Sequence, residues 1–246
     1  MKLAKQLAKL GTETAFAVSL KAADWASQGH KVYPFHLGDI NLVTPANIIE
    51  AAKKALADGH TGYCPGAGIP ELRAAIARDV GLKRGLSYSA ENVSIQPGGK
   101  PVIGKFISTV MNPGDEVLYP NPGYPIYESQ IEYQNGIAIP YGYTETEKGF
   151  ALDIEAMESG ISDKTTALIY NNYQNPNGAQ STREEMEKVA ELALKHDLWV
   201  LADDAYYEIQ YGGSPISIAN LPGMQERTVI LYTCSCLLYT SDAADE

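Results

Sequence analysis

One short apolar stretch constrains the fold of this chain more than any other: residues 198–202, Leu-Trp-Val-Leu-Ala. Its length and its polar flanks indicate a fully buried strand, of the kind that parallel sheets contain. The strand delivers Asp203 and Asp204 at its carboxyl end, where ligands bind in open α/β sheets. The strand period of two predicts that Asp203 shares a face with Trp199 and Leu201, whereas Asp204 points the other way.

A carboxylate at the buried end of a strand needs a cationic partner, because an unpaired charge is costly inside a protein. No Lys or Arg lies close to Asp203 in the sequence, so a ligand is one source of the positive charge. The alternative is that Asp203 and Asp204 only end the strand, as turn or helix-capping residues. These residues alone favour that structural interpretation. The rest of the chain reverses this preference and favours a ligand.

Strands and helices alternate along the chain. The expected strands cover residues 92–96, 116–119, 137–141, 166–170, 198–202 and 228–232, and the expected helices cover 3–28, 46–58, 71–80, 100–111 and 182–196. Thr44 and Thr182 are the predicted N-caps of two of these helices, and Glu185 completes a capping box with Thr182. This alternation predicts an α/β fold with three layers, in which helices cover both faces of a mostly parallel sheet.

Composition excludes several classes of partner and compartment. The 246 residues are 45% hydrophobic and 20% charged, as in an ordinary globular protein, and the formal net charge is −11. Such acidity argues against nucleic acid or an anionic membrane as the main partner. The amphipathic residues 1–10 lack the apolar block of a secretory signal, and three Cys indicate a reducing compartment, so we expect a cytoplasmic protein. Cys234 and Cys236 have no neighbouring Cys or His cluster, so we expect no metal site.

Polar and glycine-rich groups follow several of the expected strands. Residues 97–100, Pro-Gly-Gly-Lys, stand between a strand and a helix and offer backbone N–H groups to a phosphate. Tyr124 lies among prolines, where its ring can stack on a flat ligand or simply pack. Asn175 precedes a proline and places an amide at a strand end, although Asn-Pro also forms ordinary turns. The convergence of these groups at one edge of a sheet predicts a ligand site.

Several motifs in a fixed order resemble the class I/II aminotransferases of the aspartate aminotransferase fold, which depend on pyridoxal 5'-phosphate. The resemblance covers residues 20–235. It is carried by Leu37-Gly38-Asp39 with Thr44-Pro45, Gly62-Tyr63, Gly68–Arg73, Pro113–Pro120, Asn175–Gly178 and Asp203–Tyr206. One departure is Asn177, where the family usually has Thr.

The resemblance implies a role for each polar group around the cofactor ring. Asp203 would pair with the pyridine nitrogen and keep it protonated, which strengthens the cofactor as an electron sink. Tyr206 and Asn175 would hydrogen-bond the phenolic oxygen of the ring, and Asn175 would also help to hold the substrate carboxylate. Tyr124 would stack on the ring.

The remaining implied contacts involve the phosphate, the substrate and a second subunit. Gly98, Gly99 and Lys100 would surround the phosphate, and Gly38 would offer its backbone N–H to the substrate carboxylate. Tyr63 would reach the phosphate of the neighbouring subunit, so a homodimer is expected. The implied reaction transfers an amino group between an amino acid and a 2-oxo acid.

The lysine that forms a Schiff base with the cofactor is absent. In the family it follows a strand and a Ser-x-Ser-Lys run, but here Cys236 follows Thr233-Cys-Ser235, and no lysine occurs after Lys195. Residues 236–246 bear no relation to the family and resemble a translated sequencing adapter, so we interpret them as a non-native tail. We therefore expect an N-terminal arm, with part of a small domain, over 1–44, an incomplete cofactor-binding large domain over 45–235, and an inactive chain. The alternatives are a carbon–sulfur β-lyase or decarboxylase of the same fold, or a lysine-less binding protein.

Overall fold

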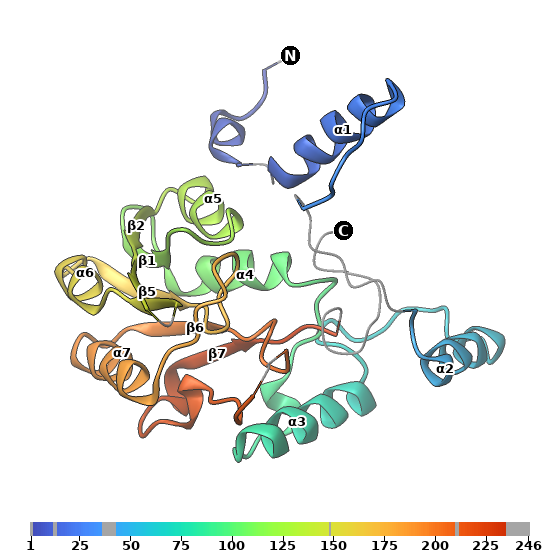
Figure 1. The fold of residues 1–246 in the computed structure, drawn as a ribbon. Helices are drawn as coiled ribbons and strands as arrows, with labels where there is room; N and C mark the ends of the chain where they lie inside the picture. Colours follow the sequence, from blue (N-terminus) through green and yellow to red (C-terminus); the bar gives the residue numbers. More distant parts are fainter. Residues whose placement is uncertain (1, 12–13, 36–42, 148, 210–211, 235–246) are drawn as a thin grey trace.

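A parallel β-sheet forms the centre of the molecule (Figure 1). The computed structural model describes residues 2–11, 14–35, 43–147, 149–209 and 212–234. The sheet has five strands in the order β2-β1-β5-β6-β7, and every neighbouring pair runs parallel. The strands are β1 (Glu116–Pro120), β2 (Ile137–Tyr141), β5 (Thr165–Tyr170), β6 (Trp199–Asp203) and β7 (Thr228–Leu231). The parallel sheet confirms the predicted fold class.

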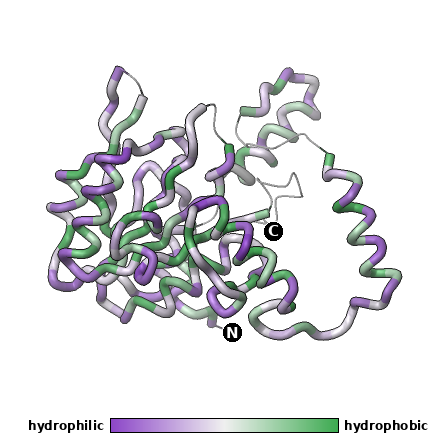
Figure 2. The backbone as a smooth tube through the Cα atoms, turned by 90° about the horizontal axis from the view of Figure 1, so that it is seen from below, coloured by the Kyte–Doolittle hydropathy of each residue, from purple (hydrophilic) through white to green (hydrophobic). Residues whose placement is uncertain are grey.

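Helices cover both faces of this sheet, as the alternation of elements predicts (Figure 1). On one face lie α4 (Lys100–Val110) and α5 (Ile126–Tyr133), and on the other lie α6 (Ile154–Ser159) and α7 (Arg183–Lys195). The N-cap of α7 is Thr182, which forms the predicted capping box with Glu185. Hydrophobic and hydrophilic stretches alternate along the tube in Figure 2, in agreement with helices that bury one side.

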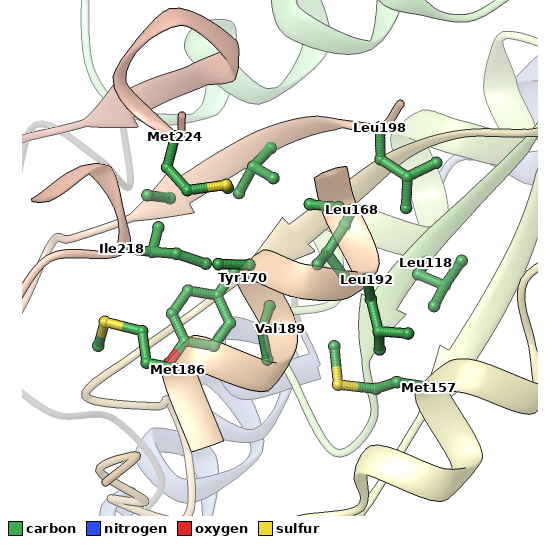
Figure 3. Close-up of a cluster of buried hydrophobic side chains, with 14 of the residues drawn as sticks. Leu118, Met157, Leu168, Tyr170, Met186, Val189, Leu192, Leu198, Ile218 and Met224 are labelled. Carbon is green, nitrogen blue, oxygen red and sulfur yellow. The ribbon is translucent and has the colours of Figure 1, made fainter. Parts of the chain in front are cut away.

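The core consists of two clusters of buried side chains, one on each face of the sheet. Successive strand residues alternate between them: Leu168 and Val200 pack with α6 and α7, whereas Ile169 and Leu201 pack with α4 and α5. Figure 3 shows the first cluster, in which side chains of α7 lie against the strands. The alternation places the last residue of β6, Asp203, on the side of α4 and α5, in agreement with the sequence prediction.

Several parts of the secondary structure were not predicted correctly, among them the helices α5 and α6. The expected strand at residues 92–96 is absent: a short 3₁₀ helix, η2 (Ala90–Asn92), is followed by irregular chain. A strand needs a neighbour that accepts its ladder of hydrogen bonds, and here the amide of Ile95 bonds the carbonyl of Ala67 instead. The sequence also did not predict the antiparallel hairpin of β3 (Tyr143–Thr146) and β4 (Gly149–Leu152).

The N-terminal helices lie outside the helical layers on the sheet (Figure 1), although the first of them contacts α5 and the last ends beside Asp204. The expected helical arm consists of a 3₁₀ helix, η1 (Lys5–Lys9), and an α-helix, α1 (Thr14–Ser27). Two further helices follow, α2 (Ala46–Ala57) and α3 (Pro70–Arg84). Thr44 is not the N-cap of α2, because the helix begins at Ala46 and the cap position falls on Pro45, which has no side chain donor or acceptor.

Two more 3₁₀ helices, η3 (Ile218–Asn220) and η4 (Gln225–Arg227), connect β6 to β7. Within the described residues, no helix combines the length and the apolar character that crossing a membrane requires.

Candidate active site

Three loops meet at the carboxyl edge of the sheet. They follow β1, β5 and β6, three adjacent parallel strands, so their first residues lie side by side. These loops carry Tyr124, Asn175 and Tyr206, and Asp203 ends β6. The structure therefore places four of the predicted site residues at one edge, which is the convergence that the sequence predicted.

Asp203 is a buried acid whose hydrogen-bond partners are neutral. Its side chain is almost fully shielded, with 5% of the residue exposed. The hydroxyl of Tyr127 donates to Oδ2 at 2.5 Å, and the amide of Ala205 donates to Oδ1 at 3.2 Å. Burial raises the pKa of Asp203, and these two hydrogen bonds oppose the shift. Among the residues that the structure describes, none forms an ion pair with Asp203.

Asp204, the next residue, is equally buried but has a cation beside it. Nη2 and Nε of Arg84 lie 2.7 and 3.1 Å from Oδ2, and Ser217 donates to the same oxygen at 3.3 Å. The guanidinium also lies over the ring of Tyr207, 3.8 Å from its centroid. Burial raises the pKa of Asp204 to about 6 although Arg84 pulls it down. Asp204 therefore joins β6 to the end of α3, and its charge is already balanced.

The contrast between these two acids tests whether the site fits a cationic ring. Both carboxylates are buried at the same strand end, yet only Asp204 has a positive partner within the described residues. A buried carboxylate without a cation is costly, so Asp203 is suited to a ligand that brings a positive charge. A protonated pyridine nitrogen has this property, and the donor set around Asp203 is compatible with it.

Tyr124 and Asn175 are connected to Asp203 through neighbouring side chains. The ring of Tyr124 contacts Tyr127 edge to face, with centroids 5.7 Å apart, and Tyr127 bonds Asp203. The backbone N–H of Asn175 donates to Oδ1 of Asn171 at 3.1 Å, and Nδ2 of Asn171 donates to the carbonyl of Asp203 at 2.9 Å. Tyr124 and Asn175 are both half-buried, so their side chains remain partly accessible beside the acid.

Gly98, Gly99 and Lys100 form the N-terminus of α4. This helix packs on β6 and β7 and leads directly into β1, so it runs antiparallel to the strands. Its N-terminus therefore lies at the carboxyl edge of the sheet, near the loops described above. Gly98 has a φ of +91°, a conformation that favours glycine. A helix N-terminus attracts phosphate through its amide groups and its dipole, so this position suits an anionic group.

The two remaining predicted residues are not brought to this edge by any described contact. Tyr63 lies between α2 and α3 with its side chain fully exposed. Gly38 falls outside the described residues.

Comparison with known proteins decides the family. Residues 32–236 match the family model for aminotransferase class I and II. The chain belongs to this family. Aspartate aminotransferase of Bacillus subtilis (strain 168) is 32% identical over 235 residues, which are 94% of this chain and 59% of that protein. Aspartate/prephenate aminotransferase of Thermus thermophilus is 33% identical over 215 residues, 87% of this chain and 56% of that protein.

Solved aminotransferase structures show the same fold. Thermus thermophilus aspartate aminotransferase tetra mutant 2, complexed with tryptophan, superposes with a TM-score of 0.92 at 29% identity. The match covers 98% of this chain and 62% of that one. Alanine aminotransferase from Pyrococcus furiosus gives a TM-score of 0.87 at 26% identity. This aminotransferase-family chain thus spans about three fifths of the length of these relatives.

Sequence reasoning missed two residues of the candidate site, Tyr127 and Asn171. Tyr127 lies 76 residues from Asp203 in the chain, and Asn171 lies 32 residues away. A usable signal for Tyr127 was its position three residues after Tyr124, because this spacing places both side chains on one side of a helical turn. Burial, and then the charge of Asp203, raise the pKa of Tyr127 well above its ordinary value, so it stays a donor.

Replacing Tyr127 with Phe is expected to lower the free energy of unfolding by about 1–3 kcal/mol, because the buried carboxylate loses a donor. The pKa of Asp203 then rises further, so its carboxylate form is less favoured by folding and the deficit grows with increasing pH. Tyr141→Phe is the matched control, since that buried hydroxyl donates to the neutral carbonyl of Ile169. Urea denaturation at several pH values measures both. A deficit of Y127F that is independent of pH would contradict the link to Asp203.

Proposed function

We propose that this chain is the cofactor-binding part of a pyridoxal-phosphate-dependent aminotransferase, which moves an amino group between an amino acid and a 2-oxo acid. The single observation that carries the proposal is Asp203: a buried acid without a described cation, beside Asp204, which has one. Membership of the aminotransferase family supports the same conclusion. We also propose the domain limits 1–44 and 45–235, with a non-native tail after them.

When bound, the cofactor supplies an electron sink for reactions at the α-carbon of an amino acid. In the proposal, Asp203 holds a proton on the ring nitrogen, and Tyr127 and Ala205 fix the orientation of its carboxylate. Tyr124 covers one face of the ring and limits the access of water to it. Asn175 and Tyr206 hydrogen-bond the ring oxygen.

The anionic groups are held elsewhere in the site. Gly98, Gly99 and Lys100 at the N-terminus of α4 bind the phosphate. Gly38 and Asn175 bind the substrate carboxylate. Tyr63, on an exposed loop, reaches the phosphate bound by a second copy, which makes the working unit a homodimer. The intact aminotransferase would act in the cytoplasm on small amino and oxo acids.

The 246-residue chain carries no lysine after Lys195, so we propose that it binds the cofactor without turnover. A lysine supplies covalent attachment and a proton shuttle in this type of chemistry. The second candidate is a lysine-less binding protein, which is disfavoured because the chain keeps the full set of expected cofactor-binding residues. The two candidates predict different results for a longer form of the protein that extends beyond residue 235. The aminotransferase would catalyse transamination in that form, and the binding protein would not.

Titration with pyridoxal 5'-phosphate, followed by absorbance and protein fluorescence, tests the proposal. We expect saturable binding, and we expect dialysis to remove the cofactor even after borohydride treatment. With aspartate and 2-oxoglutarate as substrates we expect no oxaloacetate to form. Retention of one equivalent of cofactor on a single lysine of the site after borohydride and dialysis would show a covalent attachment and contradict binding without the lysine, whereas partial labelling spread over surface lysines is expected of any aldehyde. The absence of saturable binding would overturn the cofactor assignment. Ammonia and thiol as products of the extended protein would favour the β-lyase alternative.

A further inference from the structure

Gln174 is a buried residue beside Asn175 of the candidate site, and the proposed function assigns it no role. Only 3% of the residue is exposed, and it directly precedes Asn175. Its Nε2 donates to the carbonyl of Pro122 at 2.6 Å, and its Oε1 accepts from the amide of Asn177 at 3.0 Å. Its own backbone groups bond Ala179 and Gly178, at 3.0 and 2.8 Å. Every polar group of Gln174 therefore has a partner.

The hydrogen bond to Pro122 joins two loops that are far apart in the sequence. Pro122 lies in the loop that carries Tyr124, and it is 52 residues from Gln174. The bond to Asn177 anchors the same side chain within the loop that carries Asn175. A buried amide is tolerated only when it is hydrogen-bonded, so loss of the donor leaves the Pro122 carbonyl without this partner. The side chain thus sets the spacing of the two loops.

Asn172 provides a comparison within the same loop. It is also 3% exposed, and its Oδ1 accepts from the amide of Ser181 at 2.9 Å. Its Nδ2 lies 3.4 Å from the carbonyl of Ile216, away from Pro122. Asn172 therefore resembles Gln174 in chemistry and burial but connects the loop to a different segment.

We propose that Gln174 is a positioning residue, whose side-chain amide holds the loop of Tyr124 at a fixed distance from Asn175. The identity of the ligand between them rests on the proposed function, whereas the coupling of the two loops does not. A flat ring that enters between Tyr124 and the polar edge of the sheet requires this distance to be set in advance, because ordering the loops on binding would weaken affinity.

Gln174→Glu tests the bond between the loops with little change of shape. The carboxylate keeps an acceptor for Asn177 but cannot donate to Pro122, and it repels that carbonyl. At about pH 8 we expect amide hydrogen exchange at residues 121–127 to be about three- to tenfold faster than in the wild type. At about pH 5 a buried carboxyl regains its proton and donates again, so exchange returns toward the wild-type rate at that pH. Asn172→Asp is the control and leaves exchange at 121–127 unchanged.

Affinity for pyridoxal 5'-phosphate separates positioning from a merely structural contact. We expect Q174E to bind about three- to tenfold more weakly than the wild type at about pH 8, with recovery at about pH 5. Faster exchange with unchanged affinity would overturn the positioning role. Unchanged exchange in Q174E, or the same increase in N172D, would overturn the coupling itself. A wild-type chain that does not bind the cofactor would refute the proposed function, while the exchange data still decide the coupling. If Q174E does not fold, Q174M gives the same comparison at residues 121–127 without a charge.

Discussion

Replacing Arg84 with Met is expected to lower the free energy of unfolding by about 3–5 kcal/mol, because it leaves the buried Asp204 carboxylate without its cation. Met keeps most of the volume of the arginine stem, so the loss reflects charge rather than a cavity. The double variant R84M/D204L is expected to recover much of the stability, since a buried ion pair replaced by apolar residues is often neutral. Urea denaturation of the two single variants and the double variant measures the coupling.

The matched control is the surface pair of Arg183 and Glu187, with Nε and Oε1 2.9 Å apart and side chains 61% and 48% exposed. R183M is expected to cost less than about 1 kcal/mol, because solvent screens exposed pairs. Equal losses in R84M and R183M would contradict the structural role of Asp204.

The effect of R84M also depends on pH. The folded-state pKa of Asp204, about 6, lies above the ordinary value of 3.8. Folding therefore favours the protonated acid, and this contribution is present below the ordinary value and lost as the pH rises through about 6. Arg84 lowers this pKa, so its removal raises the pKa further. We expect the deficit of R84M to grow as the pH is raised from acidic to neutral and beyond.

Asp203→Asn is expected to weaken binding of pyridoxal 5'-phosphate by roughly 10- to 150-fold, the equivalent of about 1.5–3 kcal/mol for a hydrogen bond to a charged group. The same substitution is expected to stabilise the ligand-free chain, because it removes a buried acid that has no described cation. The pKa of Asp203 is raised by burial, so its contribution to wild-type stability is lost as the pH rises through that pKa. D203N lacks this contribution and keeps only the pH dependence of the other groups, such as Asp204. Opposite signs for binding and stability are the mark of a residue kept for function.

Cofactor titration and thermal unfolding of D203N provide both measurements. Asp197→Asn is the control, because it removes the same charge from a side chain that is 93% exposed and paired with Arg227. Its affinity for the cofactor is expected to equal that of the wild type. Wild-type affinity in D203N would remove the basis of the cofactor assignment.

The alternating pattern of strands and helices was sufficient to predict the layers of the fold. The apolar run before Asp203 and the capping box of Thr182 are local signals, and the structure confirms both. The strand expected at residues 92–96 failed because strand formation depends on a partner, which local sequence does not reveal. The prediction of Thr44 as an N-cap was wrong because the cap position depends on which residue begins the helix.

The partners of the two adjacent acids could not be predicted for a similar reason. Tyr127 lies 76 residues before Asp203, and Arg84 lies 120 residues before Asp204. Nothing in the local sequence distinguishes which acid receives the cation. Only the fold makes the distinction, because it brings Arg84 at the end of α3 to Asp204 and Tyr127 of α5 to Asp203.

Because successive residues of β6 face opposite sides of the sheet, this strand is sensitive to any change in its length. Insertion or deletion of a single residue within β6 would turn the side chains that follow it in the strand, Asp203 included, to the opposite face of the sheet. The tyrosine hydroxyl and the guanidinium would then each face the wrong carboxylate or none, although both acids would still be encoded. A point substitution at either acid disturbs that acid alone. Insertion or deletion of one codon in β6 would disrupt the surroundings of both acids at once.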